Sequence, residues 1–137
     1  MKKKRIFLLP LLLLLGLLCA CGSAPPGDIS SVERTIPADA MYTEEEIADA
    51  MEEVERKFAR DFKGCTLLNL RYDEEKSITE TGNWAQEADE ALVLLSDFHV
   101  SAKCEDGGLS KGDYTDWSWI LLRNNAGSWT LRTWGYG

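Results

Sequence analysis

The chain has 137 residues, enough for one small domain, and its 23 acidic and 15 basic side chains give a formal net charge of −8. The first 20 residues contain four basic and no acidic side chains, so their removal would leave a net charge of 11 − 23 = −12. Such a chain should repel nucleic acid, because proteins that bind nucleic acid neutralise phosphates with Lys and Arg. The acidity is most simply a solvated surface that favours solubility; binding of cations or basic ligands is the alternative.

The N-terminal segment has the pattern of an export signal. Basic residues Lys2–Arg5 precede an apolar run from Ile6 to Ala20. A membrane-spanning helix needs roughly 20 apolar residues, whereas the apolar core of a signal peptide has roughly 7–15 residues behind a positive region. We therefore expect residues 1–20 to be a signal peptide, with an uncleaved N-terminal anchor as the alternative.

The end of this run, Leu18-Cys19-Ala20-Cys21-Gly22, resembles the lipobox of bacterial lipoproteins. Leu18 lies three residues before Cys21, and the small Ala20 lies directly before it. The resemblance implies cleavage before Cys21 and a diacylglyceryl group on its thiol, with acyl chains such as palmitate. Two acyl chains give stable attachment, whereas one anchors only marginally. The protein is thus expected at the extracytoplasmic face of the cell membrane, anchored by lipid without spanning it.

Residues 21–41 are expected to form a flexible tether. They contain Pro25-Pro26-Gly27 and Pro37 but no apolar periodicity, a composition that buries too little apolar surface to become ordered. The tether would hold a globular domain, residues 42–137, away from the bilayer.

An amphipathic helix is predicted over residues 43–63. Thr43 and Glu46 have the spacing of a capping box, and Gly64 is suited to end the helix. Between them, apolar residues recur at three- and four-residue steps and form one core-facing stripe. The stripe consists of Ile47, Ala50, Met51, Val54, Phe58 and Phe62.

Four strands are expected after the helix, at residues 66–72, 91–102, 114–123 and 128–134. Alternation turns Leu68, Leu70 and Tyr72 of the first strand toward the core, together with Phe98 and Val100 of the second. The polar segment 73–90 is expected to contain only a short helical turn at 84–90.

The last two strands are predicted to form a hairpin whose turn requires a positive φ at Gly127. In this register one face carries Trp117, Trp119 and Trp129, and the opposite face carries Trp134. These three tryptophans either fill the core, as large aromatic side chains most often do, or line an apolar cleft that stacks sugars or flat ligands.

A long N-terminal helix packed across a curved antiparallel sheet of about four strands would bury the apolar stripe of the helix and the apolar face of the sheet. The sequence therefore predicts an α+β domain. This arrangement resembles the NTF2-like or cystatin-like folds. Ser96–Phe98, Asp116–Arg123, Ser128–Leu131 and Gly135–Gly137 resemble segments of uncharacterised domains in lipoproteins of gut-type Gram-positive bacteria. The resemblance implies a fold more than a function.

Asp97 and His99 are the only candidates for acid–base chemistry. They share one face of a strand, and NTF2-like enzymes place such residues in the cone between helix and sheet. Because Phe98 and Val100 point inward, however, we expect the pair on the solvated face, without a catalytic role.

No metal or cofactor is expected. Asp106, Asp113 and Asp116 lie near a glycine-rich loop but lack the pattern of a calcium-binding EF-hand. An exported compartment permits a disulfide between Cys65 and Cys104. Strand parity turns Cys65 away from Cys104, and a β-bulge would correct this, so the bridge is left open.

These features favour a non-catalytic, membrane-anchored binding or interaction module with an unknown protein or small-molecule ligand. The alternative is an NTF2-like enzyme with a small-molecule pocket between helix and sheet. A structural or assembly factor, marked by an exposed apolar patch, is the third hypothesis.

Overall fold

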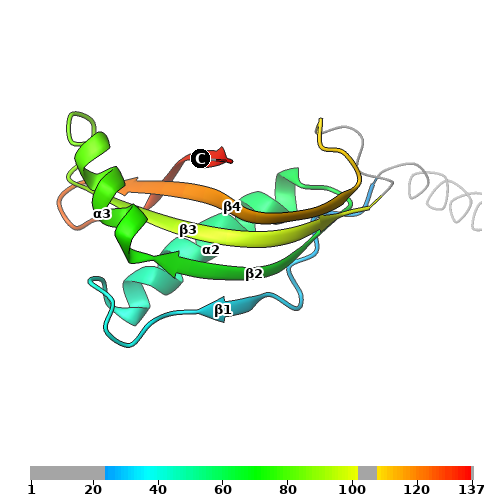
Figure 1. Cartoon of the computed structure of the whole chain (residues 1–137), viewed down its shortest axis with the longest axis horizontal. Coiled ribbons are helices and arrows are strands. Elements are labelled where there is room, and N and C mark those ends of the chain that lie inside the picture. The colour runs from blue at the N-terminus through cyan, green and yellow to red at the C-terminus, as the bar shows by residue number, and fades with distance from the viewer. Residues whose placement is uncertain (1–23, 102–107, 137) are drawn as a thin grey trace, which may run out of the picture.

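The computed structural model describes residues 24–101 and 108–136, and it confirms the α+β class. Five strands form one open sheet in the order β1-β2-β3-β4-β5; β1 is parallel to β2, and the other neighbours are antiparallel. Helix α2 lies across one face of this sheet, and α3 lies at one end of it (Figure 1). The elements are β1 (Glu33–Thr35), α2 (Glu44–Asp61), β2 (Cys65–Asp73), α3 (Glu74–Asn83), β3 (Glu90–Val100), β4 (Gly112–Arg123) and β5 (Thr130–Gly135).

Helix α2 begins at the predicted capping box. The Thr43 hydroxyl accepts a hydrogen bond from the Glu46 backbone N–H at 3.1 Å, and the Glu46 carboxylate accepts one from the Thr43 N–H at 3.1 Å. Gly64 follows the helix with a φ of 77°. Two parts of the predicted architecture are wrong: the helix is not the first element, because β1 precedes it, and the sheet has five strands instead of about four antiparallel ones, because β1 pairs parallel to β2. In the described ranges no helix is long and apolar enough to cross a membrane.

The hydrophobic core lies between α2 and the sheet. The predicted stripe of α2 is buried, and Phe58 is fully enclosed together with Phe98 and Trp119 of the sheet. The Phe58 ring centroid lies 4.9 Å from that of Phe62 and 5.7 Å from that of Phe98. Close-packed aromatic side chains therefore fill the space between helix and sheet.

Much of the predicted tether belongs to the folded unit, so that prediction is wrong for residues 25–41. The Gly27 N–H donates to the Ala59 carbonyl at 3.0 Å, and the Asp28 N–H donates to the Cys65 carbonyl at 2.8 Å. β1 then pairs with residues 69–71 of β2, and apolar side chains between and beyond these contacts pack on the core. The reason is that β2 would otherwise expose an edge of unpaired backbone groups.

Gly27 provides a test of this correction. A Cβ at this position would overlap the backbone carbonyl oxygen of Phe58 and lie 2.9 Å from its carbonyl carbon. We expect Gly27→Ala to lower the free energy of unfolding by about 1–3 kcal/mol, as overpacking does. Gly82→Ala is the control, because a Cβ there meets nothing within 4 Å and alanine favours helix. Equal stability of the two variants in urea denaturation would show that residues near Gly27 are not docked.

Register shifts account for two wrong side-chain assignments. Pairing of β2 with β3 shifts between Leu67 and Asn69, so that Leu67 is buried and Leu68, predicted to be inward, is 45% exposed. Pairing of β4 with β5 shifts between Ile120 and Leu121. Trp134 is therefore on the α2 face, not the opposite one, where the ammonium of Lys57 lies 4.3 Å from its ring centroid.

The turn between β4 and β5 also differs from the prediction. Positive φ angles occur at Asn125 (56°) and Ala126 (53°), whereas Gly127 has none. The Gly127 N–H donates to the Asn124 carbonyl at 3.0 Å. Two consecutive left-handed residues therefore reverse the chain before glycine is reached, and Asn125 is among the residue types that tolerate this conformation.

Helix α3 was not predicted, and polar contacts hold it in place. Asp73 caps it by accepting from the Lys76 N–H at 2.8 Å. The buried Ser77 hydroxyl accepts from the Val93 N–H of β3 at 2.8 Å, and the Thr81 hydroxyl accepts from the Ala91 N–H at 3.0 Å. The helix thus docks through hydroxyl groups instead of an apolar stripe, and periodicity could not reveal it.

Candidate functional site

Asp97 and His99 do not form a joint site. Phe98 is buried between them, as predicted, and His99 is exposed. The Asp97 carboxylate accepts hydrogen bonds from the Asn69 amide and the Asp116 N–H, both at 3.0 Å. The ring of His99 instead lies 2.6 Å from the Asp113 carboxylate. Both residues therefore lie on the solvated face of the sheet, as the sequence predicts, but they have different partners.

The contacts of Asp97 have a structural explanation. Pairing of β3 with β4 shifts between Ser96 and Phe98, and Asp97 bonds to both neighbouring strands at this point. Partial burial raises the pKa of Asp97, but hydrogen bonds from Asn69 and Asp116 and the charge of Arg71 outweigh burial and lower it overall. The Asp97 carboxylate thus connects β3 to β2 and β4 where the strand pairing is irregular, and it remains ionised at neutral pH.

The three candidate tryptophans have separate environments. Trp119 is fully buried, and its indole N–H donates to the Ser96 hydroxyl at 2.8 Å. Trp117 is partly buried against Phe98, with ring centroids 5.3 Å apart. Trp129 is 5% exposed and is the one of the three that lines a described cleft. A shared stacking surface of all three rings is therefore not observed within the described residues.

The cysteine predictions fall partly outside the described residues. Cys21 and Cys104 both lie there. Cys65 is buried and pairs in register with Val100 at the end of β3. The shift at Leu68 turns Cys65 toward the core, which removes the parity argument against a bridge. The possible disulfide thus stays open, as the sequence left it.

Metal-ligating side chains do not gather in the described part of the chain, where no group of three or more His, Cys, Asp or Glu could hold an ion. Of the loop aspartates, Asp113 contacts His99 and Asp116 forms an ion pair with Arg71 at 2.5 Å. Asp106 lies outside the described residues.

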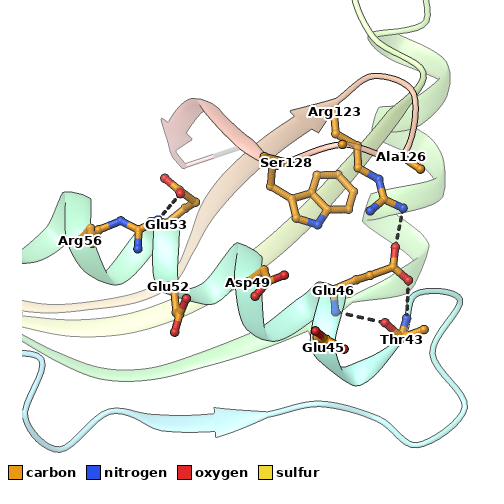
Figure 2. A pocket seen from close by; sticks show the side chains of 12 residues that line it. Thr43, Glu45, Glu46, Asp49, Glu52, Glu53, Arg56, Arg123, Ala126 and Ser128 are labelled. Carbon is orange, nitrogen blue, oxygen red and sulfur yellow. Dashed lines mark hydrogen bonds and ion pairs between the residues drawn. The ribbon is translucent and has the colours of Figure 1, made fainter.

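A cleft of about 590 Å³ separates the first part of α2 from the turn between β4 and β5. Figure 2 shows Glu45, Asp49 and Glu52 along the helix, with Arg123 and Ser128 on the hairpin. Five carboxylates and two guanidinium groups line it, a formal charge of 2 − 5 = −3, and we call it the acidic cleft. Its charged residues are Glu45, Glu46, Asp49, Glu52, Glu53, Arg56 and Arg123.

Arg123 connects the two walls of the acidic cleft. Its side chain is 8% exposed and lies 2.5 Å from the Glu46 carboxylate of α2 and 3.2 Å from Glu90 of β3. Its guanidinium carbon lies 4.3 Å from the ring centroid of Trp129. Burial lowers the pKa of Arg123, but the hydrogen bonds to Glu90 and Glu46 outweigh burial and raise it. Arg123 is therefore always charged, and its charge is satisfied inside the wall.

Other polar groups of the acidic cleft are unsatisfied. Glu45 and Asp49 are exposed, and their carboxylates have no hydrogen bond or ion pair within the described residues. The indole Nε1 of Trp129 is buried, and it too has no partner there. Buried N–H groups rarely lack an acceptor. The cleft thus combines free negative charge with a buried hydrogen-bond donor in its wall that lacks an acceptor, which suits a cationic ligand that also carries an acceptor.

Sequence reasoning found only part of this site. It names Trp129 as a cleft residue, and it treats binding of basic ligands as the alternative explanation of the acidity. The sequence places Glu46 in a capping box, but it singles out neither Arg123 nor the acidic residues farther along α2. The missing signal is spatial, since α2 and the hairpin turn are some 70 residues apart in the chain.

Comparisons with known proteins add no relative: no protein-family model, curated protein or solved structure matches the chain. The function is therefore inferred from the residues that build the acidic cleft.

Proposed function

We propose that this protein is a lipid-anchored, extracytoplasmic binding module without catalytic activity. Its ligand is positively charged and carries a hydrogen-bond acceptor, as a basic peptide segment does. The observation that carries the proposal is the unpartnered Nε1 of Trp129 in the wall of the acidic cleft. Lipidation of Cys21 is supported by the lipobox resemblance and the preceding apolar run.

A basic peptide matches the groups that the cleft presents. Ammonium or guanidinium groups of its side chains would pair with Asp49 and Glu45, and a main-chain carbonyl would accept from the indole N–H of Trp129. Arg123 keeps the opposite wall in place through Glu46 and Glu90. Because Arg123 is already paired, it adds little repulsion against a cationic ligand.

The enzyme hypothesis finds less support than the binding module. A pocket between helix and sheet would occupy the space that Phe58, Phe98 and Trp119 fill. Asp97 and His99 face away from that space and have separate partners. The relationship to NTF2-like or cystatin-like folds also stays a proposal; its support is one helix packed across the antiparallel strands β2 to β5.

Tetralysine is a suitable probe of the acidic cleft. We expect the full chain to bind it and Asp49→Asn/Glu45→Gln to bind it about two- to thirtyfold more weakly, since each exposed ion pair contributes about 0.2–1 kcal/mol. Calorimetry measures the affinity for tetralysine. NMR of the indole N–H groups locates the binding site, and the Trp129 signal is assigned from its absence in Trp129→Phe.

The matched control removes the same charge elsewhere. Glu33→Gln/Glu75→Gln changes two exposed carboxylates on β1 and α3 and should bind tetralysine like the unmodified chain. Equal weakening by both double variants would mean that only net charge matters. That result, or an unmoved Trp129 signal at saturation, would contradict binding in the acidic cleft.

A further inference from the structure

The first described residues are fixed beside the C-terminal end of α2. The Gly64 N–H, three residues after the end of the helix, donates to the Pro25 carbonyl at 2.9 Å, and the Gly27 N–H donates to the Ala59 carbonyl at 3.0 Å. These contacts place Pro25 at one end of the sheet, whereas the start of α2 and α3 lie at the other end (Figure 1). The chain therefore enters the fold at a defined end of the domain.

This entry point is close to the proposed lipid anchor in the sequence. Four residue steps separate Cys21 from Pro25, and an extended chain spans at most about 3.6 Å per residue, or about 14 Å in all. If Cys21 carries lipid, as the proposed function holds, the end of the domain around Pro25 stays within about 14 Å of the anchored residue. The domain therefore cannot stand far from the bilayer.

The charge of α2 reverses toward this same end. Residues 44–55 contain seven acidic and no basic side chains, whereas residues 56–63 contain four basic side chains and one acidic, a charge of 4 − 1 = +3. Arg56 and Arg60 are 61% and 68% exposed even though they contact Glu53 and Asp61. Lys63 is exposed as well. We call Lys57, Arg60 and Lys63 the basic end, because Arg56 is paired with Glu53 in the wall of the acidic cleft.

Neighbouring groups leave the basic end positive. Lys111 precedes β4 at this end of the sheet, where Gly112 pairs with Val100, and Asp28 and Asp113 are the nearby acids. The charges of Lys57, Arg60, Lys63 and Lys111 and of Asp28, Asp61 and Asp113 thus sum to 4 − 3 = +1 at this end, in a chain whose expected mature charge is −12. Trp134, 41% exposed beneath Lys57, adds an aromatic ring of the kind enriched at membrane interfaces.

We propose that the basic end docks on the anionic phospholipid headgroups of the membrane that anchors the protein, and that the acidic cleft faces away from it. The short connection brings Lys63 and Arg60 within reach of the surface potential, which decays within about 8 Å at physiological salt. Repulsion of the acidic start of α2 favours the same orientation. Since α2 is about 27 Å long, docking presents the cleft to ligands outside the headgroup layer.

Energy transfer from tryptophan to dansyl-labelled phosphatidylethanolamine tests this orientation. The full lipidated chain is reconstituted in phosphatidylcholine vesicles with about one third phosphatidylglycerol, an anionic lipid. The energy transfer that is lost in Trp134→Phe is the contribution of the tryptophan at the basic end. The transfer that is lost in Trp84→Phe is the contribution of the tryptophan at the end of α3. We expect transfer from Trp134 to be at least about twofold larger, because the ends are separated by roughly the length of α2.

Charge reversal separates docking from tethering alone. Arg60→Glu/Lys63→Glu, or vesicles of phosphatidylcholine only, should reduce transfer from Trp134 toward that from Trp84, whereas Lys76→Glu on α3 should not. Lipid-labelled protein with equal transfer from both tryptophans would overturn docking and leave the anchor intact. Absence of lipid from Cys21 would overturn both, and a Cys21→Ala variant identifies that case independently of energy transfer.

Discussion

Phe58→Ala is expected to lower the free energy of unfolding by about 3–5 kcal/mol, the usual cost of truncating a buried phenylalanine. Phe58 is fully buried, and its ring contacts Phe62, which caps the C-terminal end of α2, and Phe98 on β3. Loss of the ring would leave a cavity at the helix–sheet contact. Small domains are stable by about 5–15 kcal/mol, so the variant would be close to unfolding. Urea denaturation followed by circular dichroism measures the change.

Ile78→Ala is the control for this prediction. Ile78 is 57% exposed on α3, and substitutions at such positions usually change stability by no more than about 0.5 kcal/mol. If Phe58→Ala changed stability as little as Ile78→Ala does, α2 would not be packed on the sheet through Phe58.

Cys21→Ala is expected to abolish incorporation of labelled fatty acid and to move the protein from the membrane to the soluble fraction. The physical reason is that each buried CH2 contributes about 0.8 kcal/mol to membrane attachment, and the diacylglyceryl group supplies two chains. The basic end alone, on a protein of net charge 11 − 23 = −12, would not replace them. Cell fractionation with a radioactive or clickable acyl label measures both effects.

Cys19→Ala is the matched control, because it removes the neighbouring thiol and keeps Ala20 and Cys21 in place. It should keep both the label and the membrane fractionation. If labelling were lost in Cys19→Ala and kept in Cys21→Ala, the lipid would be on Cys19 instead of Cys21. An unlabelled parent chain would contradict lipidation itself.

Features set by local sequence could be predicted. The capping box of Thr43 and Glu46 and the apolar stripe through Phe58 lie within one helix, and both are observed. Strand positions followed from alternation, but a single shifted residue reverses which side chains face the core. Leu68 and Trp134 were misplaced for that reason.

Features that depend on distant contacts could not be predicted. β1 has only three residues, and its pairing with β2 rather than any pattern of its own defines it. The acidic cleft needs Asp49 on α2 and Trp129 after the hairpin turn to come together. No spacing within either segment indicates that meeting, because the intervening strands determine it.

The parallel course of β1 beside β2 has a mechanical consequence. From Asp28 to Thr35 the chain runs in the same direction as β2, with bridges at Thr66 and at residues 69–71. A force applied along the strands through the N-terminal end of this segment would stretch these hydrogen bonds together, in shear, instead of opening them one at a time. If Cys21 carries the proposed lipid, a load on that anchor would therefore be shared among several backbone hydrogen bonds of β1 and β2.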